Sequence, residues 1–292
     1  MTTRTFDSAP ASLPIYLRAA LPAIPLIGSL PGIKHASGSI PDLVVVREGV
    51  KTDPDHLEAY NEVCGFATTD TLPVTYPHLA GFGLQMTLMT DTGFPFTPMG
   101  LVHLRNRITQ HRPLTRSDVL DIRVTAADLR PHPKGMLADI LTEITVEGEP
   151  VWDEVMTVFS RGKGGNVELT EPPLDGVEAP RGVVHWKAAS NLGRRYAAVS
   201  GDRNPIHLHP LTARAFGFRS NIAHGMWTKA RAMAALQSRL PDAFNVDVEF
   251  KKPILLPATV VFGSTHHGAV TTFGVVGTKK AATHLVGQVT AT

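Results

Sequence analysis

The chain has very little cysteine, few charged residues and no long apolar run. Cys64 is the single cysteine among 292 residues, which excludes an internal disulfide and any metal site built from paired cysteines, and suits a reducing compartment. Charged residues make up 18% of the chain against 43% hydrophobic residues, a balance that excludes global disorder. The formal net charge is only +2 and the basic residues are spread along the chain, so the sequence predicts no nucleic-acid partner.

The longest apolar stretch near the start is AALPAIPLIGSLPG, residues 19–32. It is too short to cross a bilayer, and Pro22, Pro25 and Pro31 interrupt it. The same prolines, together with Asp7, disfavour a secretory signal peptide. We therefore expect a cytoplasmic protein with no stable membrane insertion.

Alternation of apolar and polar residues predicts several strands. The clearest strand is FNVDVEF, residues 244–250, in which apolar residues occupy every second position. Residues 137–159 alternate on both sides of a turn at 148–150 and predict a long antiparallel hairpin. Similar patterns cover residues 117–124 and 283–292. Because these strands follow one another without helices between them, we expect antiparallel sheets.

Helices are few in this sequence. Residues 224–240, HGMWTKARAMAALQSRL, are rich in helix formers and reach Pro241 without an internal proline. A shorter helix is predicted over residues 210–216, with Pro210 in its first turn. The 25 glycines and 23 prolines disfavour an all-helical bundle, so the expected fold class is α+β.

Two segments of the chain resemble each other. YNEVCGF at Tyr60 and YAAVSGD at Tyr196 share the pattern Tyr-x-x-Val-small-Gly, and each is followed by a predicted helix and an alternating strand. We interpret this as two diverged copies of one α+β unit. The proline- and glycine-rich residues 162–182 are then the linker between an N-terminal unit, 1–161, and a C-terminal unit, 183–292.

The two copies differ after the shared glycine. The second copy continues SGDRNPIHLH, with Asp202, Asn204 and His207, whereas the first continues with Phe66 and Thr68, which transfer no protons at neutral pH. On a tight loop Asp202 and His207 can converge, so that a histidine and a carboxylate share acid–base work while Asn204 holds them in register. The alternative is an Asx turn that caps the next helix without any activity.

A metal site is the competing hypothesis for this loop. It would use His207, His209 and His224, but the Asp-His continuation typical of metallo-hydrolases is missing after HLHPLT. We therefore expect no metal, and His209 is most simply a surface residue.

Gly225 stands at the start of the longest predicted helix, in AHGMW. The N–H groups in the first turn of a helix have no internal acceptor, so this amide could receive a developing oxyanion. The alternative is that Gly225 only begins the helix in a crowded place.

Taken together, YAAVSGDRNPIHLHPLTA, residues 196–213, resembles the signature of the MaoC-like (R)-specific enoyl-thioester hydratases. The family pattern is an aromatic residue, then small-Gly-Asp-x-Asn-Pro-aliphatic-His, and an alanine six residues beyond the histidine. The resemblance implies a hot-dog fold, in which an antiparallel sheet wraps around a central helix. PDLVVVREGVKTDPDHLEAY and GLVHLRNRITQHRPL in the N-terminal half are similar to bacterial 3-hydroxyacyl-thioester dehydratases of the double hot-dog type, in which the first copy has lost its catalytic residues.

The resemblance assigns roles to the loop. Asp202 and His207 would hold one water and add it across the double bond of a trans-2-enoyl thioester, or remove it from the (R)-3-hydroxyacyl thioester. Asn204 would orient the pair, and the Gly225 N–H would stabilise the thioester oxygen, an effect worth ~3 kcal/mol in measured oxyanion holes. No cofactor is needed. The neighbouring residues expected to line the substrate site are Ser200, Arg203, His224 and Met226.

Two features bear on the rest of the substrate. Apolar residues 79–89 and 94–100 would line a tunnel for the acyl chain, or equally form plain core. The phosphates of coenzyme A or of an acyl carrier protein need basic residues, and the sequence does not decide among the nearby arginines at positions 194, 195, 203 and 219.

Two other functions compete with the hydratase. A non-catalytic acyl-thioester- or lipid-binding subunit is disfavoured because a binder would not require Asp202, Asn204 and His207 together. A hot-dog thioesterase is disfavoured because that class generally lacks this loop. The sequence leaves open the chain length, the carrier, the physiological direction and the choice between a monomer and a homodimer of double hot-dogs.

Overall fold

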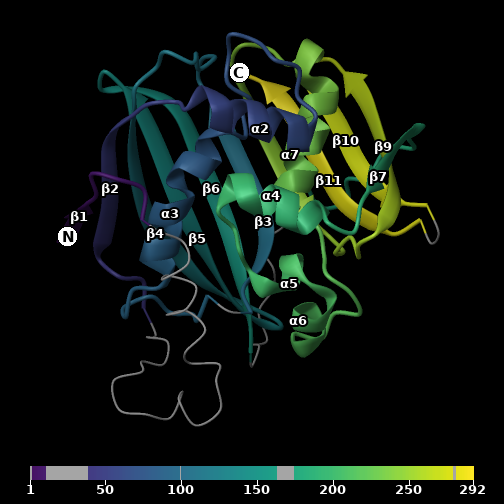
Figure 1. Ribbon diagram of the computed structural model, residues 1–292, viewed down its shortest axis with the longest axis horizontal. Helices are drawn as coiled ribbons and strands as arrows, with labels where there is room; N and C mark the ends of the chain where they lie inside the picture. The colour runs from purple at the N-terminus through teal and green to yellow at the C-terminus, as the bar shows by residue number, and fades with distance from the viewer. Residues whose placement is uncertain (1, 11–38, 99, 163–173, 279–280) are drawn as a thin grey trace.

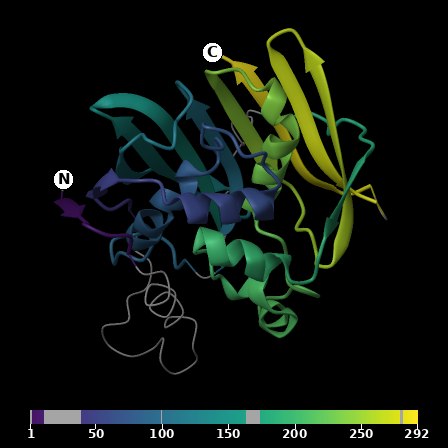
Figure 2. The same cartoon turned by 45° about the horizontal axis from the view of Figure 1, so that its top comes forward.

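The computed structural model describes residues 2–10, 39–98, 100–162, 174–278 and 281–292. In this part of the chain the strands form one 11-stranded sheet, and the helices lie on one of its faces (Figures 1 and 2). The strands are β1 (Thr2–Thr5), β2 (Leu43–Val50), β3 (Val102–Gln110), β4 (Leu120–His132), β5 (Gly135–Val146), β6 (Glu149–Arg161), β7 (Val184–Ala188), β8 (Phe244–Phe250), β9 (Ala258–His267), β10 (Val270–Gly277) and β11 (Thr283–Ala291). The helices are α2 (Pro54–Cys64), α3 (Pro77–Met89), α4 (Leu192–Ser200), α5 (Pro205–Leu208), α6 (Pro210–Ala215), α7 (Gly225–Leu236) and the 3₁₀ helix η2 (Gln237–Arg239). None of the described helices is long and apolar enough to cross a membrane.

The strand order reveals a repeat. The order is β1-β2-β4-β5-β6-β3-β8-β11-β10-β9-β7, so the strands on the two sides of the β3–β8 pair follow one pattern. Apart from the additional edge strand β1, the strand that precedes the helices in each half, β2 or β7, is farthest from this pair, and the strand that follows the central helix, β3 or β8, belongs to it. The pairs are antiparallel as predicted, except that β1 pairs in parallel with β2.

The predicted hairpin is formed by β5 and β6. Val146 pairs with Glu149, so Glu147 and Gly148 are the two turn residues. Their φ angles are 52° and 83°, the positive values that two-residue hairpin turns require. The turn therefore starts one residue earlier than the sequence predicted.

The Tyr-x-x-Val-small-Gly repeat forms the ends of two helices that sequence reasoning missed. Helix α2 ends at Gly65 and helix α4 ends at Gly201, with φ angles of 77° and 73°. Glycine adopts this left-handed conformation without a steric penalty, which explains why both copies share it. Helix α2 also begins with a readable signal, because the Asp53 side chain accepts hydrogen bonds from two backbone N–H groups and Pro54 follows it.

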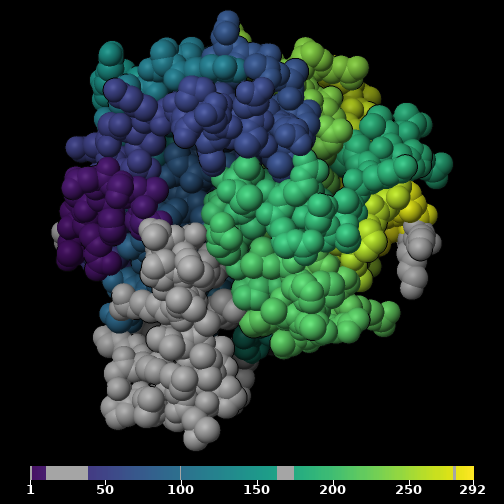
Figure 3. Space-filling view, viewed as in Figure 1, coloured from purple at the N-terminus to yellow at the C-terminus, as the bar shows by residue number. Residues whose placement is uncertain are grey.

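Helices α3 and α7 are the central helices of the two halves. Helix α7 covers most of predicted residues 224–240, and η2 continues it to Arg239. The buried side chains of both halves form one continuous apolar cluster, which includes Trp152 from β6 and Trp227 from α7. Helices α2 and α4 lie against each other on the outer side of this core (Figure 3).

The halves meet at the pair of β3 and β8. Arg107 pairs with Asp247 in register, and their side chains form an ion pair at 2.7 Å. The predicted division at residues 161 and 183 stays a prediction, since residues 163–173 of the expected linker lie outside the described residues. Within the described part, β6 ends at Arg161 and β7 begins at Val184.

Candidate active site

A turn after helix α4 presents Asp202. Its N–H donates to the Ser200 hydroxyl at 3.2 Å, and its Oδ1 accepts from the Asn204 N–H at 3.1 Å. The Asx turn considered as the inactive alternative is therefore present. It engages Oδ1, however, while Oδ2 lies 4.0 Å from the Nε2 atom of His207. The turn thus aims the second carboxylate oxygen of Asp202 at the histidine.

His207 is held within the one-turn helix α5. Asn204 caps this helix by accepting from the Ile206 N–H at 3.4 Å. The Nδ1 atom of His207 lies 2.9 Å from the carbonyl oxygen of Ile222. A carbonyl oxygen only accepts, so Nδ1 carries the proton and Nε2 has the lone pair that faces Asp202.

The gap between Asp202 and His207 suits a water molecule. At 4.0 Å the two atoms are too far apart for a direct hydrogen bond. A water that donates one proton to each atom at about 2.8 Å would span such a gap. The side chain of Asp202 is 26% exposed, which leaves the pair accessible, whereas His207 is buried.

His224, the residue before helix α7, supports both partners. Its Nε2 donates to the backbone carbonyl of Asp202 at 3.0 Å. Its ring stacks on the ring of His207, with centroids 3.7 Å apart and planes 27° apart. The buried ring of Tyr196 is tilted against it, with ring centroids 4.9 Å apart. His224 therefore holds the Asp202 loop and the His207 ring in one arrangement.

Burial keeps both histidines neutral. It lowers the pKa of His207, although the Asp202 carboxylate and the hydrogen bond to Ile222 act in the opposite direction. Burial and the neighbouring His207 lower the pKa of His224 to about 3. At neutral pH, His207 is therefore an unprotonated base.

Asp202, His207 and His224 offer ligand atoms within 4.8 Å of one another, a spacing that a metal ion could use. The donor set fits a metal poorly. The Nε2 of His224 must carry a proton to donate to the Asp202 carbonyl, so this atom has no lone pair for a metal. His209, the third histidine of the metal hypothesis, is exposed, and its Nδ1 accepts from the Leu211 N–H at 3.2 Å.

Gly225 begins helix α7, directly after His224. A Cβ atom at this position would lie 3.1 Å from the ring of Phe250, so the helix start and β8 pack closely here. The helix start is therefore crowded, as the alternative to an oxyanion role supposed. This crowding is compatible with the oxyanion role, because the N–H of a first-turn residue needs no acceptor within the helix.

The other predicted substrate contacts fall into two groups. Ser200 and Met226 are buried, and Ser200 accepts from the Asp202 N–H, so it supports the loop. Arg203 is exposed. Among the four arginines considered for phosphate binding, Arg194 donates to the Leu208 carbonyl and Arg195 pairs with a glutamate on α2, whereas the structure gives the exposed side chains of Arg203 and Arg219 no partner among the described residues.

The corresponding place in the first half is filled by an aromatic residue. Phe66 follows the cap glycine of α2, is buried, and stacks on Tyr60 with ring centroids 6.0 Å apart. Phe66 follows Gly65 as Asp202 follows Gly201, so an apolar ring stands at the position of the carboxylate. The first half therefore carries no counterpart of the carboxylate.

Sequence reasoning missed two residues that form hydrogen bonds with His207, Asn221 and Ile222. Asn221 is buried, and its Nδ2 donates to the His207 carbonyl at 3.3 Å. The next residue, Ile222, supplies the carbonyl that fixes the tautomer. Both lie in an irregular segment with no periodicity, so only the tertiary structure identifies them.

Comparison with known proteins shows the family of this chain. The profile of the MaoC like domain matches residues 178–287. The chain is 38% identical over 251 residues to 3-hydroxyacyl-thioester dehydratase X of Mycobacterium tuberculosis, an alignment that covers 86% of this chain and 87% of that protein. This chain belongs to the MaoC-like dehydratase family.

Two further matches are a solved structure and a shorter hydratase. The crystal structure of HtdX of Mycobacterium tuberculosis superposes with a TM-score of 0.76 at 34% identity, covering 85% of this chain and 100% of that one. An (R)-specific enoyl-CoA hydratase of Rhodospirillum rubrum is 34% identical over 92 residues, covering 30% of this chain and 60% of that protein. Together with the repeated sheet and its two central helices, these neighbours confirm the predicted double hot-dog fold of this family member.

Proposed function

We propose that the protein is a hydro-lyase that interconverts trans-2-enoyl thioesters and (R)-3-hydroxyacyl thioesters. The observation that carries the proposal is the 4.0 Å gap between Asp202 Oδ2 and the unprotonated Nε2 of His207. The family membership, and the names of relatives that act on hydroxyacyl and enoyl thioesters, support the same reaction.

In the hydration direction, a water lies between Asp202 and His207. The Nε2 atom of His207 accepts one proton while the water oxygen bonds to C3 of the enoyl group. Asp202 orients the water through its other proton and stabilises the imidazolium that forms. Electrons of the double bond move onto the thioester oxygen, where the Gly225 N–H stabilises the charge. The proton on His207 then passes to C2, which completes the addition of water and restores the pair.

The carrier portion of the substrate requires phosphate binding. We assign this to Arg203 and Arg219, because their guanidinium groups are exposed and the two other arginines of the segment already have partners. The acyl-chain tunnel and the cytoplasmic location stay predictions of the sequence, which leaves open the choice between coenzyme A and acyl carrier protein and the choice between a monomer and a homodimer.

The direct test is hydration of crotonyl-CoA and of a longer enoyl-CoA, followed as loss of the conjugated enoyl absorbance. We expect turnover by the wild type, with kcat reduced about 10²–10⁴-fold in Asp202→Asn and in His207→Ala. Full activity in both variants, or no turnover of either substrate by the wild type, would contradict the proposal. Release of free thiol would indicate a thioesterase, and tight binding without turnover would indicate a binding subunit.

A further inference from the structure

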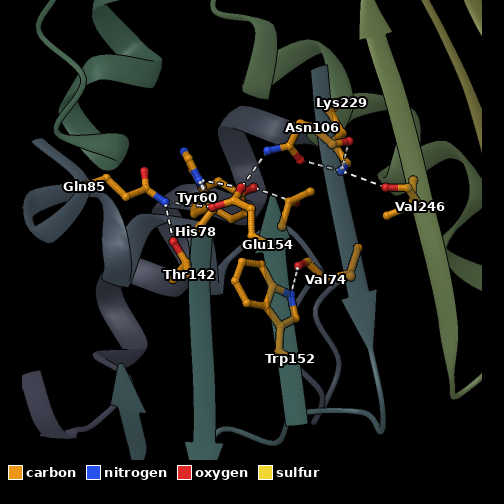
Figure 4. A network of polar contacts seen from close by, with 11 residues as sticks. Tyr60, Val74, His78, Gln85, Asn106, Thr142, Trp152, Glu154, Lys229 and Val246 are labelled. Carbon is orange, nitrogen blue, oxygen red and sulfur yellow. Dashed lines mark hydrogen bonds and ion pairs between the residues drawn. The ribbon is translucent and has the colours of Figure 1, made fainter. Parts of the chain in front are cut away.

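A buried lysine lies one helical turn beyond the oxyanion donor. Lys229 of α7 is fully buried, with 0% of its surface exposed. Its Nζ donates to the side-chain oxygen of Asn106 at 2.6 Å, to the Asn106 carbonyl at 3.1 Å and to the Val246 carbonyl at 3.1 Å (Figure 4). Burial lowers the pKa of Lys229 to about 7, and in its ammonium form all three protons are used, which holds the lysine at one point of the sheet.

The acceptors come from both halves of the molecule. Asn106 lies in β3 and Val246 in β8, the two strands that join the halves. Lys229 thus ties the central helix of the second half to a strand of the first half. No catalytic side chain of the proposed mechanism belongs to the first half, so this contact is a route by which that half can affect the reaction.

Asn106 in turn is fixed by a buried carboxylate. Its Nδ2 donates to Glu154 at 2.7 Å, while its Oδ1 accepts from the lysine. Glu154 is also held by His78 at 2.9 Å and by Gln85 at 2.7 Å, both from α3 (Figure 4). These contacts, named here the Lys229 network, place one amide between a buried cation and a buried anion and so determine which way the Asn106 side chain points.

Such a network is an unusual way to stabilise a core. Apolar residues of the same size often stabilise as well or better, because buried charges lose their hydration. What the polar contacts provide is direction, since each hydrogen bond fixes the position of its donor to within a few tenths of an ångström. The hydrogen bonds of Lys229 fix the position of helix α7, to which the lysine belongs.

Gly225 belongs to the same helix, so its position depends on where α7 is held. Residues four apart lie on one face of a helix, and both Gly225 and Lys229 face β8: Gly225 packs against the Phe250 ring and Lys229 bonds to Val246. We infer that Lys229 is a positioning residue, which fixes α7 through Asn106 and Val246 so that the Gly225 N–H meets the thioester oxygen. This rests on the proposed function, because it takes the Gly225 amide as the oxyanion donor.

The test is steady-state hydration by Lys229→Met, which keeps an unbranched side chain one atom shorter and removes its three donors. We expect kcat to fall about tenfold or more while KM changes less than about twofold, since misplacing a donor affects the transition state more than substrate binding. The matched control is Gln85→Met at the far end of the network. It removes two buried hydrogen bonds but leaves Glu154 held by His78 and Asn106, so its Tm should fall while its kcat stays at the wild-type value.

A double variant separates positioning from stability. If Lys229 acts through the Gly225 amide, Lys229→Met should cost much less kcat in a Gly225→Ala background than in the wild type. An unchanged kcat in Lys229→Met, an equal kcat loss in Gln85→Met, or the full loss in the double variant would each overturn the inference. If Lys229→Met does not fold, Asn106→Ser replaces it, because it removes the 2.6 Å bond and leaves both carbonyl bonds, with the same expectations. A wild type that hydrates no enoyl thioester defeats the proposed function instead.

Discussion

The imidazole of His224 lies flat against that of His207, 3.7 Å between centroids, and donates to the carbonyl of Asp202 at 3.0 Å. One side chain thereby contacts both members of the proposed acid–base pair. Its own pKa, lowered to about 3, keeps it uncharged at any pH where the enzyme would work, so it adds no positive charge beside His207.

Replacing His224 by phenylalanine keeps an aromatic ring against His207 and removes the hydrogen bond to Asp202. A buried hydrogen bond contributes about 0.5–1.5 kcal/mol, so we expect kcat to fall by up to about tenfold with substrate binding little affected. His209→Phe is the matched control, because His209 is exposed and its ring only caps α6. Equal kcat values in the two variants would show that His224 has no role in holding the pair.

The pH dependence of kcat/KM should report His207. Burial places its pKa below the usual 6.5, and the base is active only when unprotonated. Activity should therefore fall as the pH drops through the lowered pKa of His207. The Asp202 carboxylate raises the pKa of His207. In Asp202→Asn the acid limb of the residual activity should therefore lie at a lower pH than in the wild type. An acid limb above pH 6.5 in the wild type would contradict this assignment.

Gly225→Ala keeps the backbone N–H but adds a Cβ atom 3.1 Å from the Phe250 ring. Either the Phe250 ring or the start of α7 must give by a few tenths of an ångström. A shift of α7 moves the Gly225 N–H, so we expect kcat to fall by up to about 10²-fold, the effect of removing an oxyanion donor. Shortening the obstructing ring in Gly225→Ala/Phe250→Leu should restore part of kcat. Gly162→Ala serves as the control, since a Cβ there meets nothing within 4 Å. A wild-type kcat in Gly225→Ala would remove the oxyanion assignment.

Glu154→Gln should reduce stability in a pH-dependent way. Burial alone would raise the pKa of Glu154, but His78, Asn106 and Lys229 lower it from 4.5 to about 2. The carboxylate therefore contributes stability above pH 4.5, on the order of 3 kcal/mol, which is lost as the pH falls toward 2.

Urea denaturation at pH 7 and at pH 3 measures this difference. The gap in the free energy of unfolding between wild type and Glu154→Gln should be largest at pH 7 and narrow at pH 3. Glu149→Gln, an exposed residue of the same strand, should show no gap at either pH. A gap for Glu154→Gln that is the same at both pH values would mean that the carboxylate is not ionised in the folded protein.

Much of the fold can be predicted from local patterns. Alternation at Phe244–Phe250 and on both sides of Gly148 depends on neighbouring residues alone, and the structure forms strands there. The shared glycines at 65 and 201 predicted a repeat because a left-handed cap is a local requirement. Helix α2 was missed although Asp53 and Pro54 mark its start, since its apolar residues are few and their period is weak.

The sequence by itself determined the candidate acid–base pair, because Asp202, Asn204 and His207 lie within one loop whose hydrogen bonds are local. Only the tertiary structure decided their support and their environment. The tautomer of His207 depends on a carbonyl fifteen residues away, and the stacking of His224 depends on where α7 docks. The contact between Lys229 and Asn106 joins residues 123 positions apart, in different halves, so no local sequence pattern predicts it. Burial, which lowers the pKa values of His207 and His224, is a property of the packed core and cannot be read from neighbouring residues in the chain.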